Sequence, residues 1–96
     1  MVRHIVMFKL KDNSPAKIEE AKSLLMSMKE KVPTIKAIEV GVDFLHSSRS
    51  FDLVLITDFA TREDSFSYQE DVYHKTVVKP YMHAHRTDSV AIDYEY

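Results

Sequence analysis

Two segments constrain the fold of this chain most, because each reads as a β-strand with apolar residues on both faces: Val2 to Lys11 and Phe51 to Ala60. In the first, Val6 and Phe8 share one face and Ile5 lies on the other, since side chains alternate along a strand. Strands that are apolar on both faces need cover on both sides. The fold must therefore supply two covering layers for these strands.

The other segments predict the order β-α-β-β-α-β. Ser14 is a candidate N-cap and Pro15 suits the first helical position, after which apolar residues recur at helical spacing until Pro33 ends the helix. A second helix opens at Thr61, with Asp64 at capping-box spacing. The second helix is expected at Thr61–Glu70, and a further helical piece is expected from Val72 to a kink or end at Pro80. The remaining strands are expected at Thr34–Ser47 and Thr87–Tyr96.

This order is typical of the ferredoxin-like fold, an α+β architecture with both helices on one face of a four-stranded antiparallel sheet. With 96 residues, the chain is expected to form a single domain, residues 1–96. Two helices can cover only one face of that sheet. We therefore expect the other apolar face to pack against the same face of a second copy, which gives a homodimer.

Composition excludes several classes of function. The net charge is −2 with neutral histidines, so neither nucleic acid nor an anionic membrane surface is an expected partner. There is no cysteine, which excludes disulfides and thiolate metal sites. No apolar run approaches the roughly 20 residues of a membrane span, and the N-terminus alternates too strongly for a signal peptide. A cytoplasmic protein is the expectation.

Tyr68 and His74 are the strongest candidates for chemistry. A histidine titrates near neutrality and can act as a general base without a metal. If Asp71 caps the helical segment that follows, His74 lies in its first turn, where the positive helix end favours neutral imidazole. The Tyr68 hydroxyl could then orient a carbonyl group or stabilise an enolate. The simpler alternative is that Tyr68 packs in the core and His74 lies on the surface.

Three further histidines could contribute to a site. His4 alternates with apolar residues on its strand and is a candidate pocket-lining residue, although a lone histidine there is more often a hydrogen-bonded core residue. His83 and His85 would share one face of a strand and could bind a metal, whereas on a helix they would diverge. No acidic residue in that segment completes a site. We therefore expect neither a metal nor a cofactor.

The chain resembles the stress-responsive α/β-barrel (Dabb) domains of the dimeric α+β-barrel superfamily. The likeness covers essentially the whole chain and depends on the order and spacing of His4–Lys11, Gly41–Asp43, Phe51–Phe59, Tyr68–Lys75, Lys79–Tyr81 and Asp93–Tyr96. It implies a ferredoxin-like subunit that dimerises sheet to sheet around a barrel-like interior.

One type of member, olivetolic acid cyclase, is similar in outline and cyclises a polyketide by an intramolecular aldol reaction. Its motif is a tyrosine, five residues and a histidine, which serve as orienting group and base; Tyr68 and His74 match it. His4 matches a strand histidine that lines the cyclase pocket. This chain departs from the motif between the two residues, with Asp71-Val72 in place of His-Pro.

Two principal hypotheses about function follow. The first is a small homodimeric barrel domain whose apolar pocket binds a small apolar or polyketide-like molecule, with no assigned reaction. The second is a cofactor-independent lyase or cyclase that acts on a poly-carbonyl substrate with His74 as general base. A cofactor-independent monooxygenase is a third. Convergence of His4, Tyr68 and His74 on one cavity would keep the enzymatic hypotheses open, whereas their divergence would leave a binding or structural role.

Overall fold

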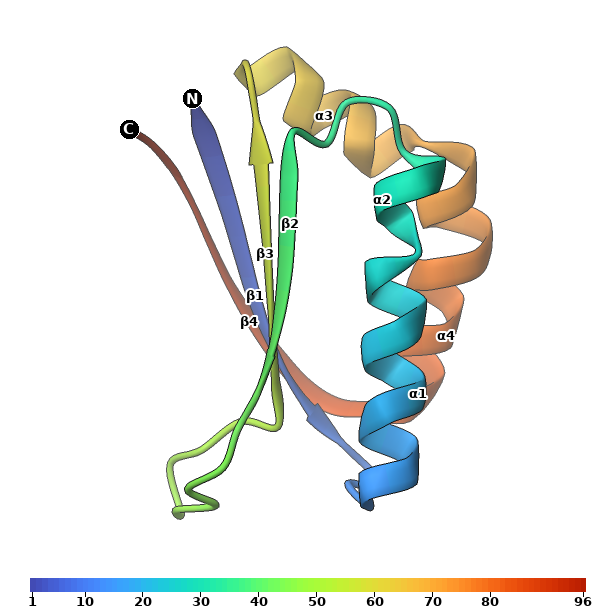
Figure 1. The fold of residues 1–96 in the computed structure, drawn as a ribbon, viewed down its shortest axis with the longest axis vertical. Helices are drawn as coiled ribbons and strands as arrows, with labels where there is room; N and C mark the ends of the chain where they lie inside the picture. The colour runs from blue at the N-terminus through green and yellow to red at the C-terminus, as the bar shows by residue number, and fades with distance from the viewer.

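A computed structural model describes residues 1–96 as one layer of strands and one layer of helices (Figure 1). All of the helices lie against the same face of the sheet. The elements are β1 (Val2–Leu10), α1 (Pro15–Met26), α2 (Met28–Lys31), β2 (Ala37–Val42), β3 (Leu53–Phe59), α3 (Arg62–Glu70), the π-helical turn η1 (His74–Val78), α4 (Lys79–His85) and β4 (Arg86–Glu95).

The four strands form an antiparallel sheet in the order β2-β3-β1-β4, which is the ferredoxin-like topology expected from the sequence. β1 is central and pairs with β3 on one side and with β4 on the other. The register places His4 opposite Thr57 of β3 and opposite Asp93 of β4. Segments from the two ends of the chain therefore lie side by side, as Figure 1 also shows.

The helix-facing side of the sheet carries the core. Phe8 and Leu10 of β1 are buried there beside Leu53 and Leu55 of β3. The helices bury a complementary set against them: Ile18, Ala21, Leu25, Met28, Tyr68, Val78 and Met82. The structure thus assigns the face that contains Val6 and Phe8 to the helices, a choice that the sequence left open.

The opposite side of the sheet, which we call the open face, has no helix against it (Figure 1). The register places Ile5 between Ile56 of β3 and Ile92 of β4, so the apolar side chains are adjacent across three strands. The full set on this face is Ile5, Met7, Val54, Ile56, Val90, Ile92 and Tyr94. Exposed apolar surface of this kind marks an interaction site.

The first helical region differs from the sequence expectation at Ser27. Ser14 caps α1 as expected, since its hydroxyl accepts a hydrogen bond from the backbone N–H of Lys17. The single helix expected before Pro33 is instead divided into α1 and α2. The Ser27 hydroxyl donates to the backbone carbonyl of Leu24 at 2.5 Å, and such local bonds compete with regular helix geometry.

The helical segment after α3 is continuous through Pro80. The helix does not end at Pro80, because the chain stays helical as far as His85. Proline lacks an N–H and its ring crowds the carbonyl four residues earlier in an α-helix. Here the π-helical turn η1 ends at Val78, two residues before the proline, and its wider i→i+5 bonding relieves that conflict.

Gly41 marks a close approach between β2 and β3. Its cross-strand partner is Val54, and a Cβ at position 41 would lie only 2.9 Å from the Cγ1 atom of that side chain. The pairing of β2 with β3 shows no register shift, so the glycine marks a close approach of the two strands and not a bulge.

Candidate functional site

A cavity of about 230 Å³, which we call the inner cavity, lies between the sheet and the C-terminal helical segments. It exists because β4 presents small side chains to the helices. Ser89 and Ala91 lie opposite Phe8 and Val6 of β1, and neither can fill the space that a larger residue would occupy. Much of its wall is apolar and comes from five elements: Val6, Phe8, Leu25, Leu55, Val78 and Met82.

The inner cavity brings together the three residues singled out in the sequence. His4 reaches it from β1, Tyr68 from α3 and His74 from η1. The Tyr68 ring is close to both imidazoles, with its centroid 4.2 Å from that of His74 and 5.8 Å from that of His4. Their exposed fractions are 8% for each histidine and 2% for the tyrosine, so none of them lies on the surface.

Asp71 positions His74 at the start of a helical turn. Its carboxylate accepts hydrogen bonds from the backbone N–H groups of Tyr73, at 2.9 Å, and His74, at 3.2 Å. The Nδ1 atom of His74 is buried without a hydrogen-bond partner. The Nε2 atom forms no hydrogen bond to another side chain and is not fully enclosed, so it is the ring nitrogen available to the cavity.

The surroundings keep both His74 and Tyr68 uncharged near neutral pH. Burial lowers the pKa of His74 below its usual 6.5, the charge of Lys79 acts in the same direction, and the Gln69 backbone opposes the shift. Burial, and not the helix end proposed from the sequence, is thus the main cause. Burial also raises the pKa of the Tyr68 hydroxyl. The cavity therefore contains a neutral imidazole beside a protonated phenol.

His4 is held by Asp93, a residue that the sequence analysis did not single out. The Nδ1 atom of His4 lies 2.5 Å from Oδ1 of Asp93 on the neighbouring strand. An ionised carboxylate can only accept, so Nδ1 donates this bond and the Nε2 atom of a neutral His4 remains an acceptor. The pairing depends on the register of β1 with β4.

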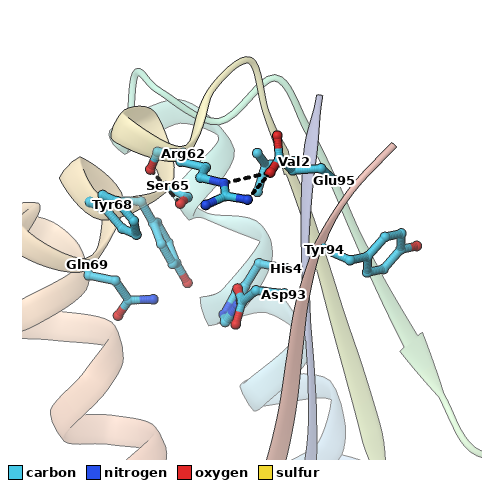
Figure 2. Close-up of a pocket in the computed structure, with 10 residues that line it drawn as sticks. Val2, His4, Arg62, Ser65, Tyr68, Gln69, Asp93, Tyr94 and Glu95 are labelled. Carbon is cyan, nitrogen blue, oxygen red and sulfur yellow. Dashed lines mark hydrogen bonds and ion pairs between the residues drawn. The ribbon is translucent and has the colours of Figure 1, made fainter.

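A second cavity of about 450 Å³ adjoins the first. His4, Tyr68 and Gln69 line both cavities, so they form the boundary between them. Figure 2 shows the second cavity, with His4 and Asp93 extending from the strands toward α3. Arg62 of α3 and Glu95 of β4 form an ion pair across it. The Tyr68 hydroxyl has no hydrogen-bond partner in the chain and is not fully enclosed.

The remaining histidines do not form a metal site with each other. His83 and His85 lie on α4 and contact different partners: His83 accepts a hydrogen bond from Arg86, and His85 stacks on Tyr81 with ring centroids 4.2 Å apart. No group of three or more histidine, aspartate or glutamate residues is placed to hold a metal ion.

The chain matches the model of one known protein family over almost its whole length. Residues 2–96 match the model of the family described as the stress responsive A/B barrel domain, Dabb. The chain belongs to the Dabb family. The resemblance seen in the sequence is thereby confirmed. No curated protein is significantly similar in sequence to the chain.

Solved structures similar to this Dabb chain share its fold at low sequence identity. The Arabidopsis thaliana protein At3g17210 is 21% identical, with 100% of this chain and 95% of that chain covered and a TM-score of 0.87. A dimeric ferredoxin-like protein from Thermobifida fusca is 21% identical, with 99% and 90% covered and a TM-score of 0.85. Hydroxynitrile lyase from Passiflora edulis is 19% identical, with 97% and 90% covered and a TM-score of 0.81.

None of the helices in this Dabb chain has the length and apolar character that crossing a membrane requires.

Proposed function

We propose that the inner cavity binds a small carbonyl compound and that His74 acts there as a general base, in a lyase or cyclase reaction that uses no cofactor. One observation carries the proposal. The Nε2 atom of His74 and the hydroxyl of Tyr68 form no hydrogen bond to another side chain, and their rings lie with centroids 4.2 Å apart beside a largely apolar space. Unpartnered polar atoms at such a place are suited to a ligand that supplies the missing hydrogen bonds.

The proposed step is a single proton transfer. The Nε2 atom of neutral His74 takes a proton from the carbon next to the ligand carbonyl, and the electron pair of the broken C–H bond forms an enolate. The Tyr68 hydroxyl donates a hydrogen bond to the developing oxyanion. In a cyclisation, the enolate carbon then attacks a second carbonyl carbon, forms the C–C bond, and the resulting alkoxide takes back the proton from His74.

His4 is assigned a positioning role in this proposal. Its Nδ1 atom is bonded to Asp93, so its Nε2 atom can accept a hydrogen bond from a hydroxyl group of the ligand. Because His4 lines the cavity from β1 and His74 lines it from η1, the ligand would be bound at two points on different elements. A ligand held at two points has fewer orientations available relative to the base.

A binding role without turnover is the second candidate, and one observation favours it. The Nδ1 atom of His74 has no hydrogen-bond partner, so no strong bond fixes the tautomer in which Nε2 carries the lone pair. Catalytic histidines usually have that tautomer fixed by a neighbour. In this case His74 and Tyr68 would only hydrogen-bond a ligand.

We also propose that the protein is a homodimer through the open face. The continuous apolar surface around Ile5, Ile56 and Ile92 supports this, because two copies would cover each other's exposed side chains. Similar chains from Bacteroides fragilis and Thermobifida fusca are described as dimeric. The inner cavity lies on the other side of the sheet, so dimerisation would leave it accessible.

The catalytic proposal can be tested without knowing the natural substrate. Proton NMR in D₂O measures how fast the methyl protons of acetophenone, a neutral methyl ketone, exchange for deuterium. The wild-type protein should accelerate this exchange, and His74→Ala should reduce the acceleration by about 10²–10⁴. Tyr68→Phe should lose less, because the base remains. His46→Asn changes an exposed histidine in the β2–β3 loop and should have no effect.

The variant His74→Gln separates loss of the base from loss of folding. It removes the imidazole but keeps a polar side chain of similar reach. Thermal unfolding of each variant establishes that it is folded. Full exchange activity in folded His74→Gln would rule out the general-base role and leave the binding role.

A further inference from the structure

The opening of the inner cavity carries positive charge that the proposed proton transfer does not use. Three basic side chains lie at its edge: Lys79 and His83 from α4, and Arg86 at the start of β4. No aspartate or glutamate occurs among the 14 residues that line this cavity. The chain as a whole has a net charge of −2, so the charge at this opening is opposite in sign to that of the whole chain.

Lys79 and Arg86 have no carboxylate partner. Lys79 and Arg86 form no ion pair, whereas the neighbouring Lys75 is bonded to Glu70 at 3.0 Å. The charge of Lys79 contributes to lowering the pKa of Glu70, but the Glu70 carboxylate accepts its hydrogen bond from Lys75. Arg86 instead donates to the Nδ1 atom of His83 at 3.2 Å. A cleft lined by charge of one sign attracts ligands of the opposite charge, so these two side chains favour an anionic group at the opening.

The π-helical turn places one of these cations near the proposed base. In η1 the backbone N–H of Lys79 bonds to the carbonyl of His74, an i→i+5 bond. Lys79 therefore follows His74 by about one turn of the widened helix, and both side chains line the same cavity. The charge of Lys79 is also close enough to act on the imidazole of His74.

We propose that the ligand of the inner cavity is a carbonyl compound with an anionic group, which lies at the opening against Lys79 and Arg86 while its carbonyl group lies beside His74 and Tyr68. This inference rests on the proposed function, because it names the class of compound that the same site takes. The apolar wall between the two ends would contact the carbon skeleton of the ligand. The shared chemistry is an anion, either a carboxylate or a phosphate.

Isothermal titration calorimetry with three probes of similar shape tests the inference. The probes are 4-acetylbenzoate, the neutral 4-acetylbenzamide and 4-acetylphenyl phosphate. We expect 4-acetylbenzoate or the phosphate to bind about five- to tenfold more tightly than the amide at low ionic strength, with the difference shrinking as salt is added. The tighter of the two anionic probes identifies the preferred anion. Equal affinity for all three probes, or no measurable binding of any, would overturn the inference.

Substitution of single basic residues shows which of them contact the anionic group of the probe. Lys79→Gln and Arg86→Gln should each remove most of the preference for the anionic probe and leave binding of 4-acetylbenzamide unchanged. Lys75→Gln is the matched control, because Lys75 lies on the same helical segment, is bonded to Glu70 and does not line the inner cavity. A similar loss in all three variants would show a general charge effect and contradict the proposed contact.

Failure of this inference and failure of the proposed function can be told apart. If Lys79→Gln leaves every affinity unchanged while His74→Gln abolishes exchange of acetophenone protons, the charged contact is wrong and the general base stands. If the anionic probes bind through Lys79 but no exchange occurs, the ligand class stands and the reaction is wrong.

Discussion

The Nδ1 atom of His4 and the Oδ1 atom of Asp93 lie 2.5 Å apart on directly paired positions of β1 and β4. The imidazole is almost buried, whereas the carboxylate is largely exposed at the second cavity. The hydrogen-bonded pair therefore extends from Asp93, at the solvent-exposed edge of the site, to His4, whose ring is next to that of Tyr68. Its orientation depends on the pairing of the first strand with the last.

Replacement of Asp93 by alanine should free the His4 ring. We expect the exchange of acetophenone protons to fall by roughly tenfold, since positioning partners of functional histidines often have effects of that size. Asp93→Asn retains an acceptor oxygen and should recover much of the activity. Nitrogen-15 NMR of the imidazole checks whether the loss comes from a freed His4 ring. The Nδ1–H signal of His4 should broaden or shift in Asp93→Ala only. An unchanged ring signal would show that Asp93 does not orient His4.

The pH dependence of the reaction should reflect the lowered pKa of His74. The base is active when unprotonated, so the exchange rate should fall on the acid side with a midpoint below pH 6.5. The raised pKa of Tyr68 means that its hydroxyl remains a donor up to at least pH 10. NMR titration of the His74 ring protons measures the same midpoint directly. A midpoint at or above pH 6.5 would contradict the burial argument.

Stability should change over the same pH range. The unfolded chain binds a proton at His74 more readily than the folded chain, so the free energy of unfolding should decrease as the pH falls from 6.5 toward the lower folded pKa. Above pH 6.5 this loss should be absent. Chemical denaturation of wild type and His74→Gln at several pH values isolates the contribution, because the variant should lack this part of the slope.

A charge on the open face should break the proposed dimer. Ile92 is 58% exposed in the single chain, so Ile92→Glu should leave the subunit folded but place a carboxylate in the interface. The lost apolar contact is about 0.8 kcal/mol for each buried methylene. Val72→Glu, at a residue that is 74% exposed on the helical side, is the control. Analytical ultracentrifugation at micromolar concentration should show dimers for wild type and for Val72→Glu, and monomers for Ile92→Glu. A monomeric wild-type protein would refute the proposed dimer.

The close packing at Gly41 gives a further stability prediction. Gly41→Ala should destabilise the protein by about 1 kcal/mol, because the added methyl group would press on the Val54 side chain. In a Val54→Ala background the same change should cost much less, since the contacted atom is gone. Equal costs in both backgrounds, measured by chemical denaturation, would show that this contact is not responsible.

Much of the fold could be predicted from local patterns. Ser14 and Thr61 begin helices because their side chains accept backbone N–H groups, and this chemistry is visible in the sequence. The alternation around Val6 and Phe8 and the apolar opposite face at Ile5 indicated a sheet with helices on one side only. The order of elements then restricted the topology to very few arrangements.

The details of the site were less accessible to sequence reasoning. Asp93 was missed because its role depends on the register of strands from opposite ends of the chain, and no local pattern specifies that register. The only signal was the position of Asp93 on a strand expected beside the strand of His4. The π-helical turn at His74–Val78 was also missed, because residue spacing does not distinguish i→i+5 from i→i+4 bonding.

The central claim is that a ligand carbonyl group binds beside His74 and Tyr68 in the inner cavity. The most direct test is a crystal structure of the protein soaked with 4-acetylbenzoate. We predict electron density for the acetyl oxygen within hydrogen-bond distance of the Tyr68 hydroxyl, with the methyl carbon next to Nε2 of His74. Density for the probe only in the second cavity or on the open face, with the inner cavity empty, would contradict the account.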